Sequence, residues 1–155
     1  MRIGLNRLMI IGLLACPTVS VASTEALAYE EQSLQIGGIS HIVRVPRGYR
    51  LELLTDRLDG PRFMTFTEKG DLLIGSRSGK LYRLAPPYTK PEVLVTLDDY
   101  PHSVALRDNE IFIGRTSGLY RAAYQPGQKS IADKSVSLVA SLPEGSGHSS
   151  RTVAI

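Results

Sequence analysis

The feature that most constrains the fold of this chain is a stretch that occurs in it twice. Residues 70–83 read GDLLIGSRSGKLYR, and residues 108–121 read DNEIFIGRTSGLYR. Each copy has a polar turn, an aliphatic or aromatic run, a glycine, a short polar turn that ends in glycine, and then Leu-Tyr-Arg. Such self-similarity is typical of proteins built by stacking copies of one supersecondary unit. We therefore expect a repeat architecture.

Each copy belongs to a unit of strand-length segments joined by short turns. We predict strands at 62–67, 71–76, 80–84 and 92–97 in the first unit, and at 102–106, 110–115, 119–123 and 135–142 in the second. Turns this short join antiparallel strands, because a parallel crossover needs about a dozen residues or more. Four antiparallel strands in about forty residues, with no sustained helical period, predict an all-β fold made of β-propeller blades.

A third unit begins near the end of the sequence. Residues 149–155 match the first strand of each earlier unit, so we expect two full blades and the start of a third. A closed propeller needs at least about four blades, which predicts that residues 41–155 are the N-terminal portion of a truncated ring. The alignment places Arg62, His102 and Arg151 at one equivalent position, the start of the innermost strand. Inner strands line the central channel, so these residues are expected near its mouth.

The first 22 residues have the features of a secretory signal peptide. Arg2 and Arg7 precede an apolar run at 8–15, about half of the length that spans a bilayer. We expect cleavage after Ala22, with Ala28 as a later alternative, and a periplasmic or secreted protein. Residues 13–16, LLAC, also loosely resemble a bacterial lipobox, in which Cys16 would be lipidated.

The segment that follows the signal is less regular. Residues 23–40 are polar, without a sustained period, and are predicted to form a linker or an early loop. Residues 42–43 and 49–55 are then expected to be extended on either side of a turn at 46–48. Loss of Arg2 and Arg7 with the signal would leave 16 basic and 15 acidic side chains, a formal charge of +1 instead of +3. This balance does not favour a nucleic-acid partner or an anionic membrane surface.

Two patterns that resemble functional motifs are better explained as turns. The run GSRSGK at 75–80 has three residues between its glycines, where a Walker phosphate loop has four, and no helix pattern follows it. A hairpin turn explains both glycines. Asp98 and Asp99 are adjacent, so their carboxylates are expected to point apart in a solvated turn and not to share acid–base work.

The sequence LPEGSGHSSRTVA at 142–154 carries the most informative constellation. His148 follows a glycine in a loop just before an inner strand, where an imidazole would be accessible and could take a proton from a bound alcohol. Arg151, three residues later, could hold an anion. The structural alternative is a loop histidine with a local hydrogen bond and a rim arginine in an ion pair.

Four motifs together resemble the glucose/sorbosone dehydrogenase family. They are LDGPRFM at 58–64, GDLLI at 70–74, YPHSVAL at 100–106 and, above all, GHSSRT at 147–152. Members of this family are secreted or periplasmic six-bladed propellers that use pyrroloquinoline quinone (PQQ) with calcium. The likeness covers the chain from about residue 45 onward.

The resemblance implies roles for particular residues. His148 matches the family's general base, which removes a sugar hydroxyl proton while hydride passes to the quinone. Arg62 and Arg151 are implied as cofactor or channel contacts, and the partners would be an aldose or sorbosone-type sugar and an external electron acceptor. The family's calcium ligands and most of its quinone-binding basic residues lie in later blades. We therefore assign no metal ligand here and expect the 155-residue chain to be inactive by itself.

Two other functions fit the same architecture. One is a non-enzymatic secreted propeller that binds a partner or a glycan, and the other is a gluconolactonase-like propeller hydrolase. A propeller fold does not distinguish between them, because function depends on the site.

Overall fold

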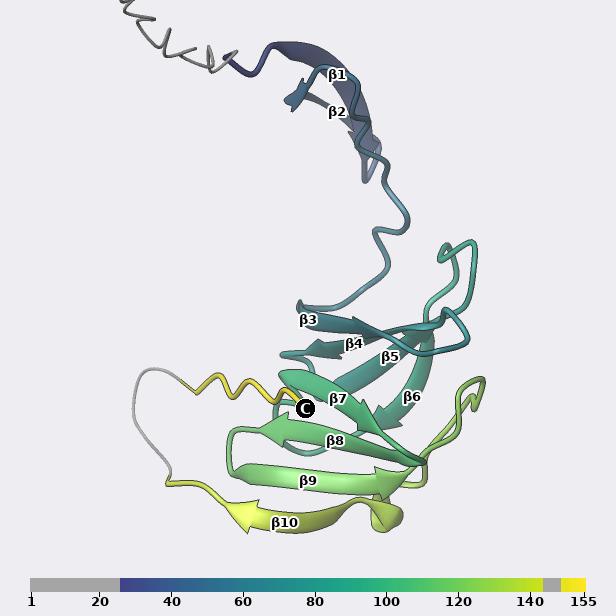
Figure 1. Ribbon diagram of the computed structural model, residues 1–155, viewed down its shortest axis with the longest axis vertical. Helices are drawn as coiled ribbons and strands as arrows, with labels where there is room; N and C mark the ends of the chain where they lie inside the picture. Colours follow the sequence, from purple (N-terminus) through teal and green to yellow (C-terminus); the bar gives the residue numbers. More distant parts are fainter. Residues whose placement is uncertain (1–25, 144–148) are drawn as a thin grey trace, which may run out of the picture.

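The computed structural model describes residues 26–143 and 149–155. Within these residues the strands form three antiparallel sheets, one with two strands and two with four (Figure 1). The only helical element among them is a single 3-10 turn, η1 (Asp133–Ser135), and none is long and apolar enough to cross a membrane. The expected all-β class is confirmed for the described part of the chain. The signal peptide, its cleavage after Ala22 and Cys16 fall outside it.

Each repeat unit forms one four-stranded antiparallel sheet. The first sheet has the order β3 (Pro61–Phe66), β4 (Leu72–Ser76), β5 (Lys80–Leu84), β6 (Glu92–Thr96). The second has the order β10 (Ser137–Ser141), β9 (Gly118–Ala123), β8 (Glu110–Arg115), β7 (Ser103–Arg107). The predicted hairpins are all present. The observed boundaries differ from the predicted ones by one residue in most strands and by two at the start of β10.

The two sheets stack on each other through an apolar core. Both sheets contribute fully buried side chains to it, among them Leu73, Leu81 and Leu94 from the first and Ile111 and Ile113 from the second. Strand β7 packs beside β3 and β4, as Figure 1 shows. Burial of each such side chain stabilises the fold by about 1.5–3 kcal/mol. The two sheets therefore share one apolar core.

The repeated glycine lies where one unit meets the next. A Cβ atom on Gly75 would overlap the carbonyl oxygens of Pro101 and His102, which lead into β7. A Cβ atom on Gly114 would lie 2.8 Å from the carbonyl oxygen of Arg151. Both glycines thus leave room for the chain that leads into the following unit, and this explains why each copy of the repeat carries one.

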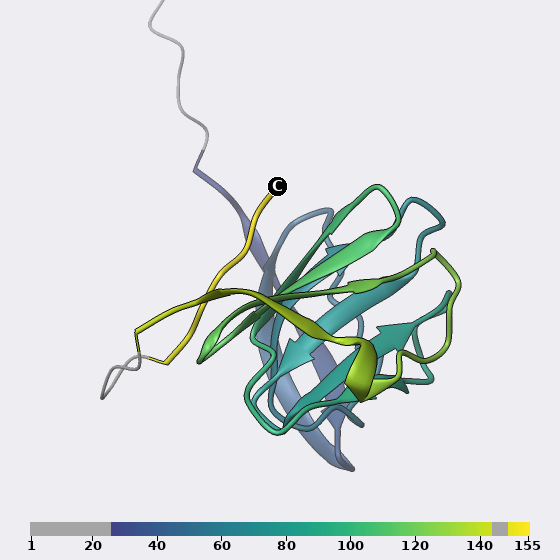
Figure 2. The same ribbon diagram turned by 90° about the horizontal axis from the view of Figure 1, so that it is seen from below.

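Residues 149–155 follow the second sheet in the way that Pro101 and His102 follow the first. The Ser103 hydroxyl donates a hydrogen bond to the Arg151 carbonyl oxygen at 2.9 Å and accepts one from the Val153 N–H at 2.8 Å. This segment, yellow in Figures 1 and 2, therefore runs beside the start of β7. It is not part of a sheet among the described residues, and the two stacked sheets do not by themselves form a closed ring.

The N-terminal segment differs from the prediction. Residues 23–40 do not form only a linker or early loop, because β1 (Tyr29–Ile36) pairs with β2 (Ile39–Pro46) in a tight hairpin. Gly37 and Gly38 supply the two positive φ angles, 55° and 81°, that a two-residue turn of this kind requires. Most side chains of β1 are exposed, so its sequence does not alternate between apolar and polar residues. The strand was not predicted for this reason.

The predicted extended segment at 49–55 also differs, because it forms no strand. The side chain of Gln32 holds it against the hairpin instead. The Leu51 N–H donates to Gln32 Oε1 at 3.0 Å, and Gln32 Nε2 donates to the Leu51 carbonyl oxygen. These two hydrogen bonds attach Leu51 to β1, while residues 49–55 stay outside any sheet.

Candidate functional site

The candidate site lies at the end of the stacked sheets where β3 and β7 begin. Backbone hydrogen bonds bring four segments together there. The Arg77 N–H donates to the Gly60 carbonyl oxygen at 2.9 Å, and the Phe63 N–H donates to the His102 carbonyl oxygen at 3.2 Å. The His102 N–H in turn donates to the Gly114 carbonyl oxygen at 2.9 Å. The start of β3, the end of β4 and the residues before β7 are therefore neighbours.

Arg62 and Arg151, the two predicted cofactor contacts, both reach Ser150. Arg62 Nη2 donates to Ser150 Oγ at 3.3 Å, and Arg151 Nη1 donates to the Ser150 carbonyl oxygen at 3.3 Å. Arg151 Nη2 also donates to the Pro143 carbonyl oxygen at 3.0 Å. Arg62 is exposed and Arg151 is half-buried. The fold thus brings together two arginines that are far apart in the sequence.

His148, the predicted general base, lies outside the described residues. The described chain resumes at Ser149, whose carbonyl oxygen accepts a hydrogen bond from Thr116 Oγ1 at 3.3 Å. Ser149 is followed by Ser150 and Arg151. The position of His148 in the sequence therefore connects it directly to the segment that carries two residues of the site.

His102 is fully buried. Neither ring nitrogen has a hydrogen-bond partner within the described structure, and the ring packs edge-on against Tyr100 with centroids 5.8 Å apart. Burial lowers the pKa of His102, and the positive charges of Arg62 and Arg77 lower it further. The imidazole is therefore neutral at pH 7, enclosed, and unable to accept a proton directly from a dissolved substrate.

Arg77 is a member of the site that the sequence analysis missed. It occupies the turn between β4 and β5, and its side chain is exposed. None of the ion pairs among the described residues involves Arg62 or Arg77. There was no sequence signal at this hairpin turn, because the second copy of the repeat has Thr116, and not an arginine, at the position equivalent to Arg77.

The carboxylates of this region have other partners. Asp98 pairs with Arg115 at 2.5 Å, and Asp59 lies 3.9 Å from Lys80 Nζ. Asp99 Oδ2 accepts hydrogen bonds from the N–H and the hydroxyl of Ser117 at 3.0 and 2.7 Å. Burial alone would raise the pKa of Asp99, but these hydrogen bonds outweigh burial and lower it. Arg62 and Arg77 thus lie in a locally cationic region.

A groove of about 410 Å³ lies along β3, β7 and residues 152–155. Three runs line it, and they comprise residues 63–66, 103–106 and 152–155, with Glu68 beside them. Each run starts directly after one of the aligned residues Arg62, His102 and Arg151. Phe63, Met64 and Phe66 leave 47%, 62% and 62% of their surface exposed there. The lining of the groove is therefore both polar and apolar, and the aligned residues Arg62, His102 and Arg151 do not themselves line it.

The described residues contain no group of three or more His, Cys, Asp or Glu side chains that could hold a metal ion. Calcium prefers six to eight oxygen ligands, mostly carboxylates and carbonyls. The described residues therefore do not fit a calcium site, and no step of the chemistry below depends on one.

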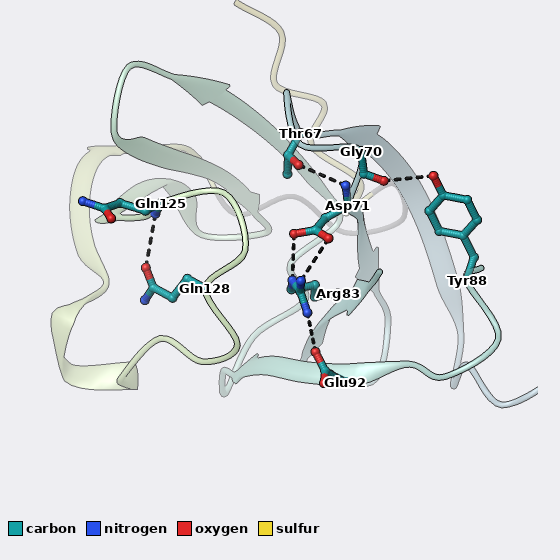
Figure 3. Close-up of polar contacts among 8 residues, drawn as sticks. All are labelled: Thr67, Gly70, Asp71, Arg83, Tyr88, Glu92, Gln125 and Gln128. Carbon is teal, nitrogen blue, oxygen red and sulfur yellow. Dashed lines mark hydrogen bonds and ion pairs between the residues drawn. The ribbon is translucent and has the colours of Figure 1, made fainter. Parts of the chain in front are cut away.

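A second polar cluster belongs to the scaffold. Arg83 donates from Nε and Nη2 to the two carboxylate oxygens of Asp71, each at 2.9 Å, and from Nη1 to Glu92 at 2.5 Å (Figure 3). Burial would lower the pKa of Arg83, but these bonds raise it above its ordinary value. The buried hydroxyl of Tyr124 lies in the field of the same ions, and burial raises its pKa. These groups are enclosed between the sheets and stabilise their contact.

Comparison of the chain with family models, with curated proteins and with solved structures gave no match in any of the three. The functional assignment therefore rests on the residues and the geometry described above.

Proposed function

We propose that the two sheets are the first blades of a β-propeller and that a third blade, beginning at residues 149–155, packs on the free face of the second sheet. The contact between the first two sheets supports this. The next unit covers one face of the first sheet, whereas the corresponding face of the second includes the exposed strand β10. A groove of about 320 Å³ separates that face from residues 151–154. At both Gly75 and Gly114 the backbone of the following segment approaches closely. This similarity favours the same packing of each unit on the next in all three units.

We infer further that the propeller is a periplasmic or secreted PQQ-dependent dehydrogenase of aldose or sorbosone-type sugars. The observation that carries the inference is that Arg62 and Arg151 both contact Ser150, next in sequence to the residues of β3 and of 152–155 that line a groove. His148 is linked to the same segment by sequence. An external acceptor would reoxidise the cofactor.

The charge of two arginines supports the proposed quinone. PQQ carries carboxylates on a flat aromatic body, and guanidinium groups bind carboxylates through paired N–H donors. Arg62 and Arg151 would hold the carboxylates, and Phe63, which is half exposed in the neighbouring groove, would contact the rings. When bound, the quinone supplies a two-electron acceptor.

The contribution of His148 to this chemistry would be to take the hydroxyl proton of the sugar. The C–H hydrogen leaves with its electron pair, so the alcohol becomes a carbonyl and atoms and charge balance. A positioned general base of this kind contributes about 10²–10⁴-fold in rate.

The nucleotide sequence downstream of the Ile155 codon provides the first test. We expect an in-frame continuation that encodes about four more units of the same pattern. A stop codon at that point would contradict the proposal of a dehydrogenase and favour an inactive remnant. With the longer protein, N-terminal sequencing of the exported product should begin at Ser23, the residue after the predicted cleavage site.

The second test is the activity of that longer protein. PQQ-dependent dye reduction with aldoses is expected, and His148→Ala should lower kcat by about 10²-fold or more. His41→Ala, which changes an exposed histidine of the β1–β2 hairpin, is the matched control and should leave the rate unchanged. An unchanged rate in His148→Ala would refute the assigned base. Glycan or protein binding without dye reduction would favour the non-enzymatic alternative.

A further inference from the structure

The outer edges of the two four-stranded sheets differ in what covers them. Strand β6 forms the outer edge of the first sheet, and the Ile131 N–H donates to the carbonyl oxygen of Leu94, in the middle of β6, at 2.7 Å. Ile131 lies between β9 and β10 of the second unit, and its side chain is buried. The edge of the first sheet is therefore closed by the unit that follows it.

Strand β10 occupies the position in the second sheet that β6 occupies in the first. The two strands are irregular at the same point, because Val139 lies between the paired residues of β10 as Leu94 lies between those of β6. Val139 is 47% exposed, whereas Leu94 is 1% exposed. Among the described residues, no backbone group outside β9 bonds to β10. The edge of the second sheet is therefore open in this part of the chain.

The sequence of β10 lacks the features that usually protect an open edge. Edge strands of native proteins often carry lysines, other charges or prolines that prevent pairing with another chain. Residues 137–141 read SLVAS, with no charge and no proline, and all five are exposed. The bulge at Val139 does not protect the edge, since β6 has a bulge at Leu94 and still accepts the hydrogen bond from Ile131. Strand β10 is thus suited to pair with a further strand.

The order of residues in β10 favours a second copy of this chain as the partner. The sequence SLVAS is nearly the same in both directions, with serine at each end and apolar residues between. Antiparallel pairing of two copies about Val139 places Ser137 opposite Ser141 and Leu138 opposite Ala140. Residues of the same kind then face each other, and no like charges are opposed. The contact is isologous, so it closes at two copies.

We propose that two copies of the chain associate by antiparallel pairing of β10 with β10, which joins their four-stranded sheets across the two-fold axis. One pair of five-residue strands is a small contact, so the dimer is weak and forms at high concentration. In a longer protein, a third unit would bring its own residues to this edge, as Ile131 is brought to β6. The proposal therefore concerns the chain of 155 residues, and it does not depend on the proposed reaction.

The first test is the molar mass of the exported chain, measured by sedimentation equilibrium from about 10 μM to about 1 mM. The exported chain is used because the apolar run at 8–15 would associate by itself. We expect a monomer at the lowest concentration and a dimer at the highest. A monomer throughout, or species larger than a dimer, would overturn the proposal.

A lysine in β10 tests which strand makes the contact. Val139→Lys should weaken the dimer at least about tenfold, because two lysines would face each other near the two-fold axis. Val93→Lys is the matched control, since Val93 lies on the covered strand β6 and is 45% exposed, close to the value for Val139. It should leave the dimer unchanged. An equal loss in both variants would overturn the proposal.

Met64→Lys distinguishes this dimer from head-to-tail stacking of the sheets. Met64 is exposed on β3, which lies at the opposite end of the stack from β10 (Figure 1). Contact between the first sheet of one copy and the second sheet of another would involve Met64, whereas pairing of β10 with β10 does not. Met64→Lys should therefore leave the dimer unchanged. A loss as large as in Val139→Lys would assign the association to head-to-tail stacking and refute the proposal.

Hydrogen exchange locates the contact without any substitution. Amides of β10 that point away from β9 should exchange more slowly as the concentration rises, because the second copy supplies acceptors for them. Amides of β6 should exchange at a constant rate. A mass that rises with concentration while exchange in β10 stays constant would place the contact elsewhere and overturn the proposal. Dehydrogenase activity is measured on the longer protein, so each proposal can fail without the other.

Discussion

The two four-stranded sheets have the same strand order and the same repeated sequence, but they bury the equivalent ion pair very differently. Arg83 and Asp71 in the first sheet are 8% and 5% exposed, and Arg121 and Glu110 in the second are 52% and 40% exposed. The register is the same, since Arg83 lies opposite Leu73 and Arg121 lies opposite Phe112. The difference arises because the second sheet covers the first and no described sheet covers the second. Position in the stack, and not the repeat itself, decides the environment of each residue.

The largest expected effect comes from breaking the two ion pairs separately. Asp71→Ala should lower the free energy of unfolding by about 3 kcal/mol, because it leaves Arg83 buried with only Glu92 as a partner. Glu110→Ala should lower it by about 0–1 kcal/mol, because an exposed ion pair contributes little. Urea denaturation of the two variants measures both values. Equal losses would show that the second sheet is as well covered as the first.

The repeated glycines allow a second comparison of the units. Gly75→Ala should destabilise the protein by about 1–3 kcal/mol, since the new methyl group would overlap two backbone carbonyl oxygens of the next unit. Gly114→Ala should cost less, because the carbonyl it approaches belongs to residues 149–155, which can shift away. Thermal unfolding gives the difference. A larger loss in Gly114→Ala would mean that residues 149–155 are held as firmly as the residues before β7.

The smallest expected effect concerns His102, which is buried where the equivalent residue of the first unit, Arg62, is exposed. Burial first, and then the arginines, lower the pKa of His102 below its ordinary value of 6.5. The unfolded chain therefore binds more protons below that pH, and the stability due to neutral His102 is lost as the pH falls from 6.5 toward the lower pKa of the folded state.

His102 contributes at most about 1.4 kcal/mol per pH unit to the slope of the unfolding free energy against pH. His102→Leu should remove it, and the apolar side chain should leave stability at pH 7 within about 1 kcal/mol, since no hydrogen bond is lost. Urea denaturation at a series of pH values measures the slope. Persistence of the full slope in His102→Leu would assign it to other groups.

Much of the fold was predictable because it is local. The turns at 68–70, 77–79 and 108–109 are short, so adjacent strands had to pair antiparallel, and the structure has each of these hairpins. The hairpin of β1 and β2 was not predicted, since its side chains are mostly exposed on both faces and its sequence has no apolar period. The glycine pair at 37–38 was the one local signal that could have indicated it.

The candidate site was predictable only in part. The alignment of repeats placed Arg62, His102 and Arg151 at equivalent positions, and the structure has them close together at one end of the inner strands. Arg77 was missed because it lies in a hairpin turn, where an exposed arginine is common and carries no functional signal. His102 was aligned correctly, but its complete burial was not predicted, since that depends on how the second unit packs against the first.

The sequence by itself determined the strands, their antiparallel pairing and the division into repeat units, because turn residues and their spacing act over a few residues. The tertiary structure decided which face of each sheet is covered, and it brought the start of β3 and the residues before β7 together. These features depend on contacts between residues far apart in the sequence, such as the bond from the Phe63 N–H to the His102 carbonyl oxygen. Local pattern cannot specify such contacts, because they form only when two already paired sheets bury their apolar faces against each other.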